Sequence, residues 1–175
     1  MIHAKLKGRL VDIEVTDDAD GSFCPGYVIA ESPTLICIRR FCDFFLDGYE
    51  VLKKTRLHAI RTTASNRFIE NVVKAERLIE ESKKLQSIDI STEDAFLEDV
   101  VRRKLPLAAY WADGSKTACL TLGFVTDVGS QTFDMLAISS TGTLGKRIKR
   151  LKRSAIYGYM YGDRYTTLYG KYVQK

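Results

Sequence analysis

Short runs in which apolar and polar residues alternate predict β-strands over most of the chain. Val11, Ile13 and Val15 recur at every second position of 5–15, as in a strand with one buried face. Similar runs follow, separated by turns rich in Gly, Pro, Asp and Ser. We therefore expect further strands at 23–30, 35–41, 49–52 and 57–61, and at 107–111, 117–126, 132–139, 146–153 and 156–161.

The hydrophobic period changes in the middle of the chain. From Ile69 onward apolar residues fall at helical spacing, and the run to Gln86 contains neither Gly nor Pro. A second helix is predicted to begin at Ser91 or Thr92, because these residue types cap helices, and Pro106 lies just past its end. The sequence thus predicts a mainly β protein with helices between two β-rich stretches.

The two β-rich stretches, 26–72 and 123–168, repeat one order of motifs. Each has a Gly before a short apolar strand, a second apolar strand, a glycine loop, a basic strand that ends in Ala-Ile, and an Arg-aromatic pair. The matching motifs are Gly26 and Gly123, Asp47-Gly48 and Thr141-Gly142, Ala59-Ile60 and Ala155-Ile156, and Arg67-Phe68 and Arg164-Tyr165. A repeat of this period indicates a duplicated structural unit. We predict a first unit at 1–65, a helical connector at 66–104 and a second unit at 105–175.

Both units resemble the Sm-like family, whose members are small five-stranded barrels and include the bacterial Sm-like RNA chaperone. The family has a helix, a strand, an Asp-Gly or Asn-Gly turn, a strand ending near Gly, a long strand, a basic strand and a last short strand. In this chain those places are taken by Asp94–Lys104, Asp113-Gly114, Gly123, Phe133–Ile138 and Ala155-Ile156. The chaperone's Lys-His-Ala-Ile signature is matched at three of four positions by Leu57-His58-Ala59-Ile60.

The resemblance implies a fold and a set of partners. The fold would be two tandem Sm-like (SH3-like) five-stranded barrels with connecting helices. The partner would be RNA, contacted in part by His58, although a lone His is more often a structural polar residue. Sm-like barrels assemble by pairing the fourth strand of one barrel with the fifth of the next, which implies a homo-oligomer built through edge strands. The Asp and Asn with which the family binds bases are not reproduced in the turns at 31–34 and 127–131.

Charge distinguishes the second unit from the first. The net charge of the chain is +5, whereas the residues from Leu105 onward alone carry +6, from ten Lys and Arg against four Asp. Six of these bases lie in one predicted strand: Lys146, Arg147, Lys149, Arg150, Lys152 and Arg153. Such a run neutralises nucleic-acid phosphates without reading base sequence. It also suits an edge strand whose charge prevents stray pairing with other chains.

Three tyrosines share one face of the last predicted strand: Tyr157, Tyr159 and Tyr161. Aromatic side chains beside a basic run can stack on unpaired bases. Core or interface packing is favoured over stacking, because the glycines on the opposite face cannot fill a core. We therefore predict that the three tyrosines form an interface.

Residues for catalysis, metal binding and membrane insertion are sparse. The four cysteines form no Cys-x-x-Cys pair and the chain has only two histidines, so we expect neither a metal site nor a cofactor. No nucleophile elbow is present, and we expect no enzymatic activity. No apolar run approaches the ~18 residues that cross a bilayer, and 1–5 lacks a signal-peptide core, which predicts a cytoplasmic protein without membrane contact.

Two functions remain open on these grounds. The first is a non-catalytic nucleic-acid-binding module for single-stranded RNA, acting as a scaffold or chaperone. The alternative is a structural adaptor that oligomerises through its edge strands without binding nucleic acid. The basic strand suits the first function as a binding surface and the second as an assembly edge.

Overall fold

The computed structural model describes residues 6–15, 23–78, 88–112 and 118–174. In these residues ten antiparallel strands form one open sheet with the order β5-β1-β2-β3-β4-β10-β6-β7-β8-β9. The first five strands are β1 Leu10–Val15, β2 Phe23–Glu31, β3 Leu35–Cys42, β4 Phe45–Lys53 and β5 Leu57–Arg61. The second five are β6 Pro106–Ala112, β7 Ala118–Val128, β8 Thr132–Ile138, β9 Leu144–Lys152 and β10 Ile156–Tyr161. The predicted mainly β fold is confirmed, and β5 and β10 have the predicted bounds.

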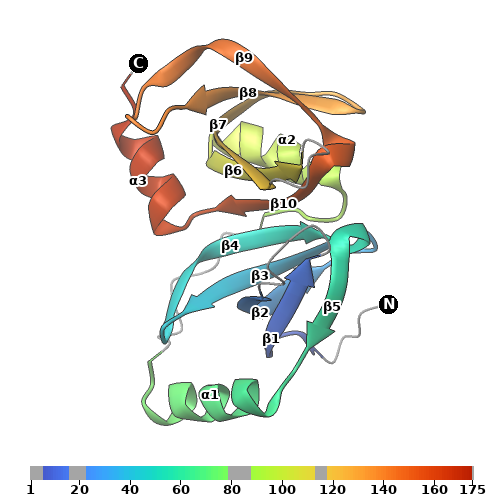
Figure 1. The fold of residues 1–175 in the computed structure, drawn as a ribbon, viewed down its shortest axis with the longest axis vertical. Helices are drawn as coiled ribbons and strands as arrows, with labels where there is room; N and C mark the ends of the chain where they lie inside the picture. The colour runs from blue at the N-terminus through green and yellow to red at the C-terminus, as the bar shows by residue number, and fades with distance from the viewer. Residues whose placement is uncertain (1–5, 16–22, 79–87, 113–117, 175) are drawn as a thin grey trace.

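Both halves of the chain arrange their strands in the same order. In the first half (6–78) the order is fifth, first, second, third, fourth, and the second half (88–174) repeats it as β10-β6-β7-β8-β9. A 3-10 turn joins the fourth strand to the fifth in each half, at Lys54–Arg56 and at Arg153–Ala155. Figure 1 shows the halves stacked, with β4 of the first beside β10 of the second. The duplicated order of motifs is therefore matched by a duplicated order of strands.

The buried residues repeat as well. One face of the first-half strands buries an apolar cluster: Val11, Ile13, Val28, Ile36, Ile38 and Leu52. The strand registers place equivalent buried residues in the second half: Leu107, Ala109, Val125, Phe133, Met135 and Leu151. The second cluster is larger, because a helix adds Phe96 and Val100, and β3 adds Leu35 and Cys37 from its other face. The halves thus share part of one core.

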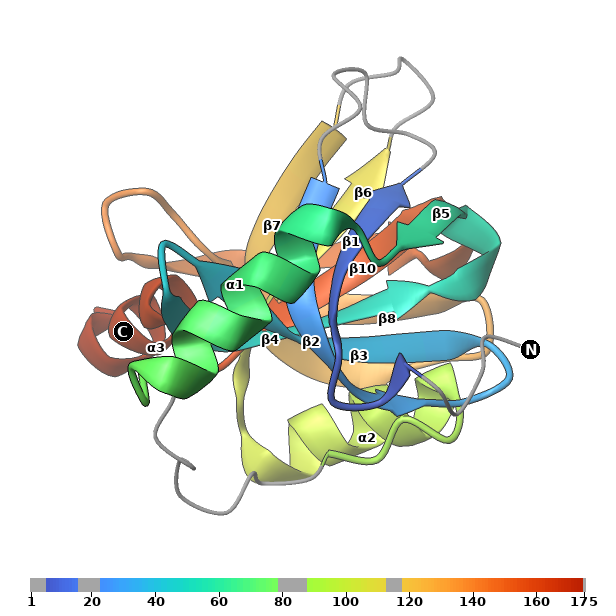
Figure 2. The same cartoon turned by 90° about the horizontal axis from the view of Figure 1, so that it is seen from below.

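In the described part of the chain three helices lie against the sheet: α1 Ala64–Ala75, α2 Glu93–Arg103 and α3 Arg164–Tyr172. Each is preceded by an N-cap residue whose side chain accepts a hydrogen bond from a backbone N–H of the first turn, namely Thr63, Thr92 and Asp163. Figure 2, which views the molecule from below, shows α1 across the first half and α2 on a different side of the sheet. The predicted connector thus holds two helices, of which α1 packs on β1 and α2 on β7. The predicted run of helix to Gln86 is interrupted, because α1 ends at Ala75 and Arg77 has a positive φ. The remainder of that run at 79–86 and the Asp113-Gly114 turn lie outside the described residues.

The third helix, α3, was not predicted. It follows β10 as α1 follows β5, and it packs on the second half in the place that α1 occupies on the first. Ile69 and Val73 of α1 pack near Leu10, and the residues at equivalent positions, Tyr169 of α3 and Val173 just past its end, pack near Ala108. The duplicated unit therefore includes the helix after its fifth strand.

The halves are joined by antiparallel pairing of β4 with β10. Leu52 pairs with Gly158 and Tyr49 with Tyr161, and the two tyrosine rings stack with their centroids 5.1 Å apart. A Cβ on Gly158 would lie 2.6 Å from Leu52 Cδ2, so the absence of a side chain there permits this close approach. The joint uses the fourth strand of one unit and the fifth of the other, and the equivalent strands, β9 and β5, form the two outer edges of the sheet.

Candidate functional site

The basic strand predicted from the sequence is β9, at one outer edge of the sheet. Four of its predicted binding residues are exposed along this edge: Lys146, Arg147, Arg150 and Lys152. They are brought together because a strand presents successive side chains at a spacing of about 3.3 Å. Their positive charges therefore follow one another along this outer strand of the second half.

The bases of β9 differ in their partners. Arg150 donates two hydrogen bonds to Asp134 on β8, both of 2.8 Å, and this hydrogen bonding holds the pKa of Asp134 below its ordinary value. Lys149 donates to Thr121 Oγ1 at 2.9 Å, and its Nζ lies 4.8 Å from the ring centroid of Trp111. Within the part of the chain that the structure describes, Lys146, Arg147 and Lys152 have no ion-pair partner. These three cations are available to an anionic ligand.

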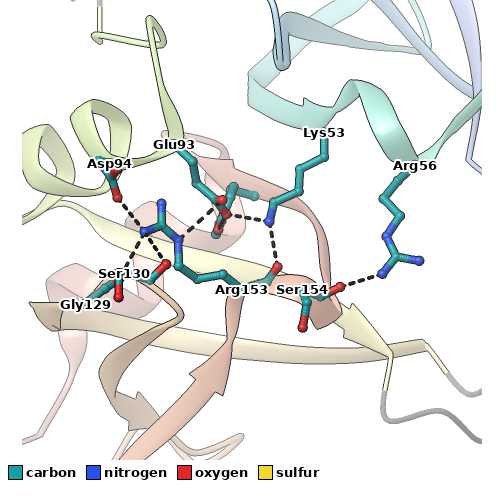
Figure 3. A network of polar contacts seen from close by, with 9 residues as sticks. Lys53, Arg56, Glu93, Asp94, Gly129, Ser130, Arg153 and Ser154 are labelled. Atoms are coloured by element: carbon teal, nitrogen blue, oxygen red, sulfur yellow. Dashed lines mark hydrogen bonds and ion pairs between the residues drawn. The ribbon is translucent and has the colours of Figure 1, made fainter.

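Arg153, the last base of the predicted run, is buried and does not belong to the exposed edge. Its guanidinium donates to Gly129 O at 2.9 Å and to the carboxylate of Asp94, and its Nε lies 3.4 Å from Glu93 Oε2 (Figure 3). These contacts hold the turn between β7 and β8 against the first turn of α2. Arg153, which the sequence grouped with the nucleic-acid-binding bases, therefore lies apart from the exposed bases of β9, and its charge is used inside the fold.

Glu93 links both halves through one carboxylate. Lys53 Nζ, from the end of β4, lies 2.7 Å from Glu93 Oε1, and the hydroxyl of Tyr159 on β10 donates to the same oxygen. Lys53 also donates to Arg153 O at 2.6 Å. Figure 3 shows Glu93 between Lys53 and Arg153. Burial lowers the pKa of Lys53, and the adjacent carboxylate opposes that effect. We call Lys53, Glu93, Asp94, Arg153 and Tyr159 the Glu93 cluster.

The first half has a simpler counterpart of this cluster. Lys54 is the first residue of the 3-10 turn in the first half, and Arg153 is the first residue of the equivalent turn in the second half. Its Nζ donates to Ser32 O at 2.6 Å and to Glu31 Oε2 at 2.9 Å, in the turn between β2 and β3. A cation at this position thus ties the same turn in both halves, which identifies the role of Arg153 as structural.

His58 lies on β5, at the outer edge of the sheet opposite β9. Its side chain is exposed. Although β5 and β9 are at opposite ends of the sheet order, Arg56 just before β5 donates to Ser154 O just after β9 at 2.5 Å. The start of the His58 strand therefore lies beside the end of the basic strand.

The tyrosines predicted to form an interface lie inside the chain. Tyr159 is fully buried among Phe96 and Phe133, and Tyr161 is buried between Phe96 and Tyr49. Tyr157 is half-buried and faces Tyr110, with ring centroids 6.0 Å apart. Tyr159 and Tyr161 therefore hold the halves and α2 together and are not on a surface open to a partner.

The structure also has a cavity beneath α1 that the sequence did not indicate. Its volume is about 770 Å³, and its lining includes Arg9, Arg39 and Glu70. Glu70 accepts hydrogen bonds from Leu10 N at 2.7 Å and from the Arg9 guanidinium. In the second half the equivalents of Leu10 and Glu70 are Pro106, which has no N–H to donate, and Gly170, which lies directly on the Pro106 ring. These two differences between the halves are the sequence features from which a cavity in the first half alone could have been inferred.

Comparisons with protein-family models, with curated proteins and with solved structures find no match for this chain. In the described residues no group of three or more His, Cys, Asp or Glu side chains could hold a metal ion. None of the helices described is both long enough and apolar enough to span a membrane. The resemblance to the Sm-like family stays a prediction.

Replacing Glu93 tests the Glu93 cluster. Glu93→Ala removes the carboxylate shared by Lys53, Arg153 and the Tyr159 hydroxyl. Breaking a buried ion pair leaves its partners desolvated, so we expect a loss on the order of 3 kcal/mol in the free energy of unfolding, measured in urea. Asp94→Ala is the matched control, because the Asp94 side chain is 61% exposed and should contribute less than about 1 kcal/mol. Equal losses of unfolding free energy in the two variants would contradict the central role of the Glu93 carboxylate in the cluster.

Proposed function

We propose that this chain is a non-catalytic module that binds single-stranded nucleic acid along β9, with RNA as the expected partner, and that it acts as a scaffold or chaperone. The observation that carries the proposal is a difference between two equivalent strands. The paired fourth strand, β4, contains Asp47, Glu50 and a single base, Lys53. The free fourth strand, β9, contains three exposed cations that have no partner in the described chain.

The duplication makes this difference informative. Both strands occupy the same place in the unit, so the requirements of the unit itself do not account for a basic run in one alone. The basic strand is the one left open at the edge, where phosphates can approach it. Lys and Arg on such an edge release counterions from a nucleic-acid backbone on binding, which gives a salt-dependent affinity without base readout.

We also propose that each half is an Sm-like (SH3-like) five-stranded barrel. The strand order, the 3-10 turn before the fifth strand and the equivalent bulges in β2 and β7 support this proposal. The helix α2 precedes the second half as the family's helix precedes its barrel. The preference for single-stranded RNA follows from this resemblance.

Charge reversal on β9 tests the proposed function. The triple variant Lys146→Glu, Arg147→Glu and Lys152→Glu is expected to weaken binding of labelled oligouridine. It should also reduce the slope of log affinity against log salt by roughly 0.7 for each lost phosphate contact. Fluorescence anisotropy across a salt series measures both quantities.

A control with the same change in charge comes from the first half. Arg67→Glu, Lys74→Glu and Arg77→Glu on and just after α1 alter exposed residues away from β9. We expect this triple variant to keep the wild-type salt slope. A slope that falls equally in both triple variants would show that net charge, and not the β9 edge, determines binding.

The second candidate function, an adaptor that oligomerises through edge strands, is favoured by the β4–β10 joint. That joint pairs the fourth strand of one unit with the fifth of the other. A second copy could pair its β5 with β9 in the same way, since both strands lie at outer edges. Repeated pairing of this kind would give a ring or an open filament.

The register of the joint indicates what opposes such pairing. Within the joint Glu50 lies opposite Met160. The strand registers make Lys149 on β9 the equivalent of Glu50, and Arg61 on β5 the equivalent of Met160. A second copy in this register would place two cations directly opposite each other, which is destabilising. We therefore expect a chain that remains monomeric at low salt.

Reversing one of these charges tests the register. Lys149→Glu places an acid opposite Arg61 of the next copy and is expected to promote association at low salt, without nucleic acid, in sedimentation velocity. Lys152→Glu makes the same change in charge outside the paired positions and should leave the chain monomeric. A wild-type oligomer at low salt that neither substitution alters would exclude this mode of assembly and favour the adaptor function through another surface.

A further inference from the structure

Helix α3 has an apolar face that the fold does not use. Its inner face packs on the second half, where Thr166 is fully buried and Tyr169 lies in an apolar cluster with Ala108 and Met160. Its outer face carries Tyr165, Leu168 and Tyr172, which are 42%, 47% and 67% exposed. Large apolar side chains gathered on one exposed face indicate a binding surface.

This outer face borders a groove of about 330 Å³ between α3 and the loop 139–143. The groove is lined by Ser140, Thr141, Gly142, Leu168, Tyr169 and Tyr172. Its two walls are tied together, because Tyr169 donates to Ser140 O at 3.0 Å and Gln174 N donates to Gly142 O at 2.8 Å. Leu144 N in turn donates to Gln174 O at 3.0 Å. The groove is therefore formed before any ligand arrives.

The groove is continuous with the basic strand. The loop that forms one wall leads directly into β9, whose first exposed cations are Lys146 and Arg147. Lys171 belongs to α3, which forms the other wall of the groove, and its Nζ lies 5.1 Å from the ring centroid of Tyr172. None of the described residues that line the groove is acidic. An anionic chain that follows β9 would reach the groove without passing a carboxylate in its lining.

Among its described residues, the first half has no long loop or exposed tyrosine at the position equivalent to this groove. Its third and fourth strands are joined by a two-residue turn, Asp43-Phe44, in which both residues have positive φ. The outer face of α1 carries a half-buried Val72 at the position of Tyr172. The longer loop and the exposed tyrosine thus occur in the half that also carries the basic strand.

We propose that this groove holds one unpaired base of a single-stranded nucleic acid whose phosphates lie along β9. The inference rests on the proposed function. Tyr172 and Tyr169 supply aromatic surface for stacking, which every base can use. Ser140 and Thr141, which also line the groove, carry hydroxyl groups that can hydrogen-bond the polar edge of a base. The cations of β9 would hold the adjoining backbone.

The test compares a base-bearing ligand with one that has no bases. Binding of labelled oligouridine of about twelve residues, within the usual range of site sizes, is measured beside binding of an abasic chain of the same length. Wild type is expected to bind oligouridine more tightly than the abasic chain. Tyr172→Ala should weaken oligouridine binding on the order of ten-fold, leave the abasic chain unaffected and keep the salt slope unchanged.

Two controls separate stacking from a loss of structure. Tyr172→Phe keeps the ring and is expected to keep wild-type affinity. Phe68→Ala removes an exposed aromatic residue from α1 and should leave both affinities unchanged. If Tyr172→Ala has no effect while charge reversal on β9 still weakens binding, the groove is excluded and the proposed function stands. If wild type binds neither chain, the proposed function itself is excluded.

Discussion

The antiparallel pairing of β4 with β10 is the interaction on which the rest of the structure depends. It turns two five-stranded arrays into one sheet and gives β4 and β10 a partner for backbone N–H and C=O groups that would otherwise lie at an edge. The Glu93 cluster reinforces this joint, because one carboxylate of α2 contacts Lys53 from the first half and Arg153 from the second. Tyr159 and Tyr161 fill the space beneath it. The joint therefore combines backbone pairing, a buried ionic contact and aromatic packing.

The joint also determines which surfaces remain for function. It uses one fourth strand and one fifth strand, so the other copies of these strands become the outer edges, β9 and β5. The halves have diverged accordingly. The second half has a basic edge and an aromatic groove, whereas the first half has two acids and one base in β4 and a cavity beneath α1. An exposed basic strand resists pairing with other chains and attracts polyanions at the same time.

Strands were predictable from the sequence because their alternation and turns are local signals, and β5 and β10 match the predicted bounds. Helix α3 was missed because Thr166, Gly170 and its tyrosines have modest helix propensity, which left Asp163 as its main signal. The burial of Arg153 could not be predicted, since it depends on acids of α2 that are distant in sequence. For the same reason, local pattern did not reveal that β4 would pair with β10.

Amide hydrogen exchange of the free chain, followed by mass spectrometry, tests the β4–β10 joint most directly. Exchange slows where backbone amides are hydrogen-bonded within stable structure. We expect peptides from β4 and β10 to exchange slowly, as do those from the interior strands β3 and β6, and peptides from β9 and β5 to exchange faster. Rapid exchange throughout β4 and β10, together with protection of β5 and β9, would contradict the arrangement of the two halves.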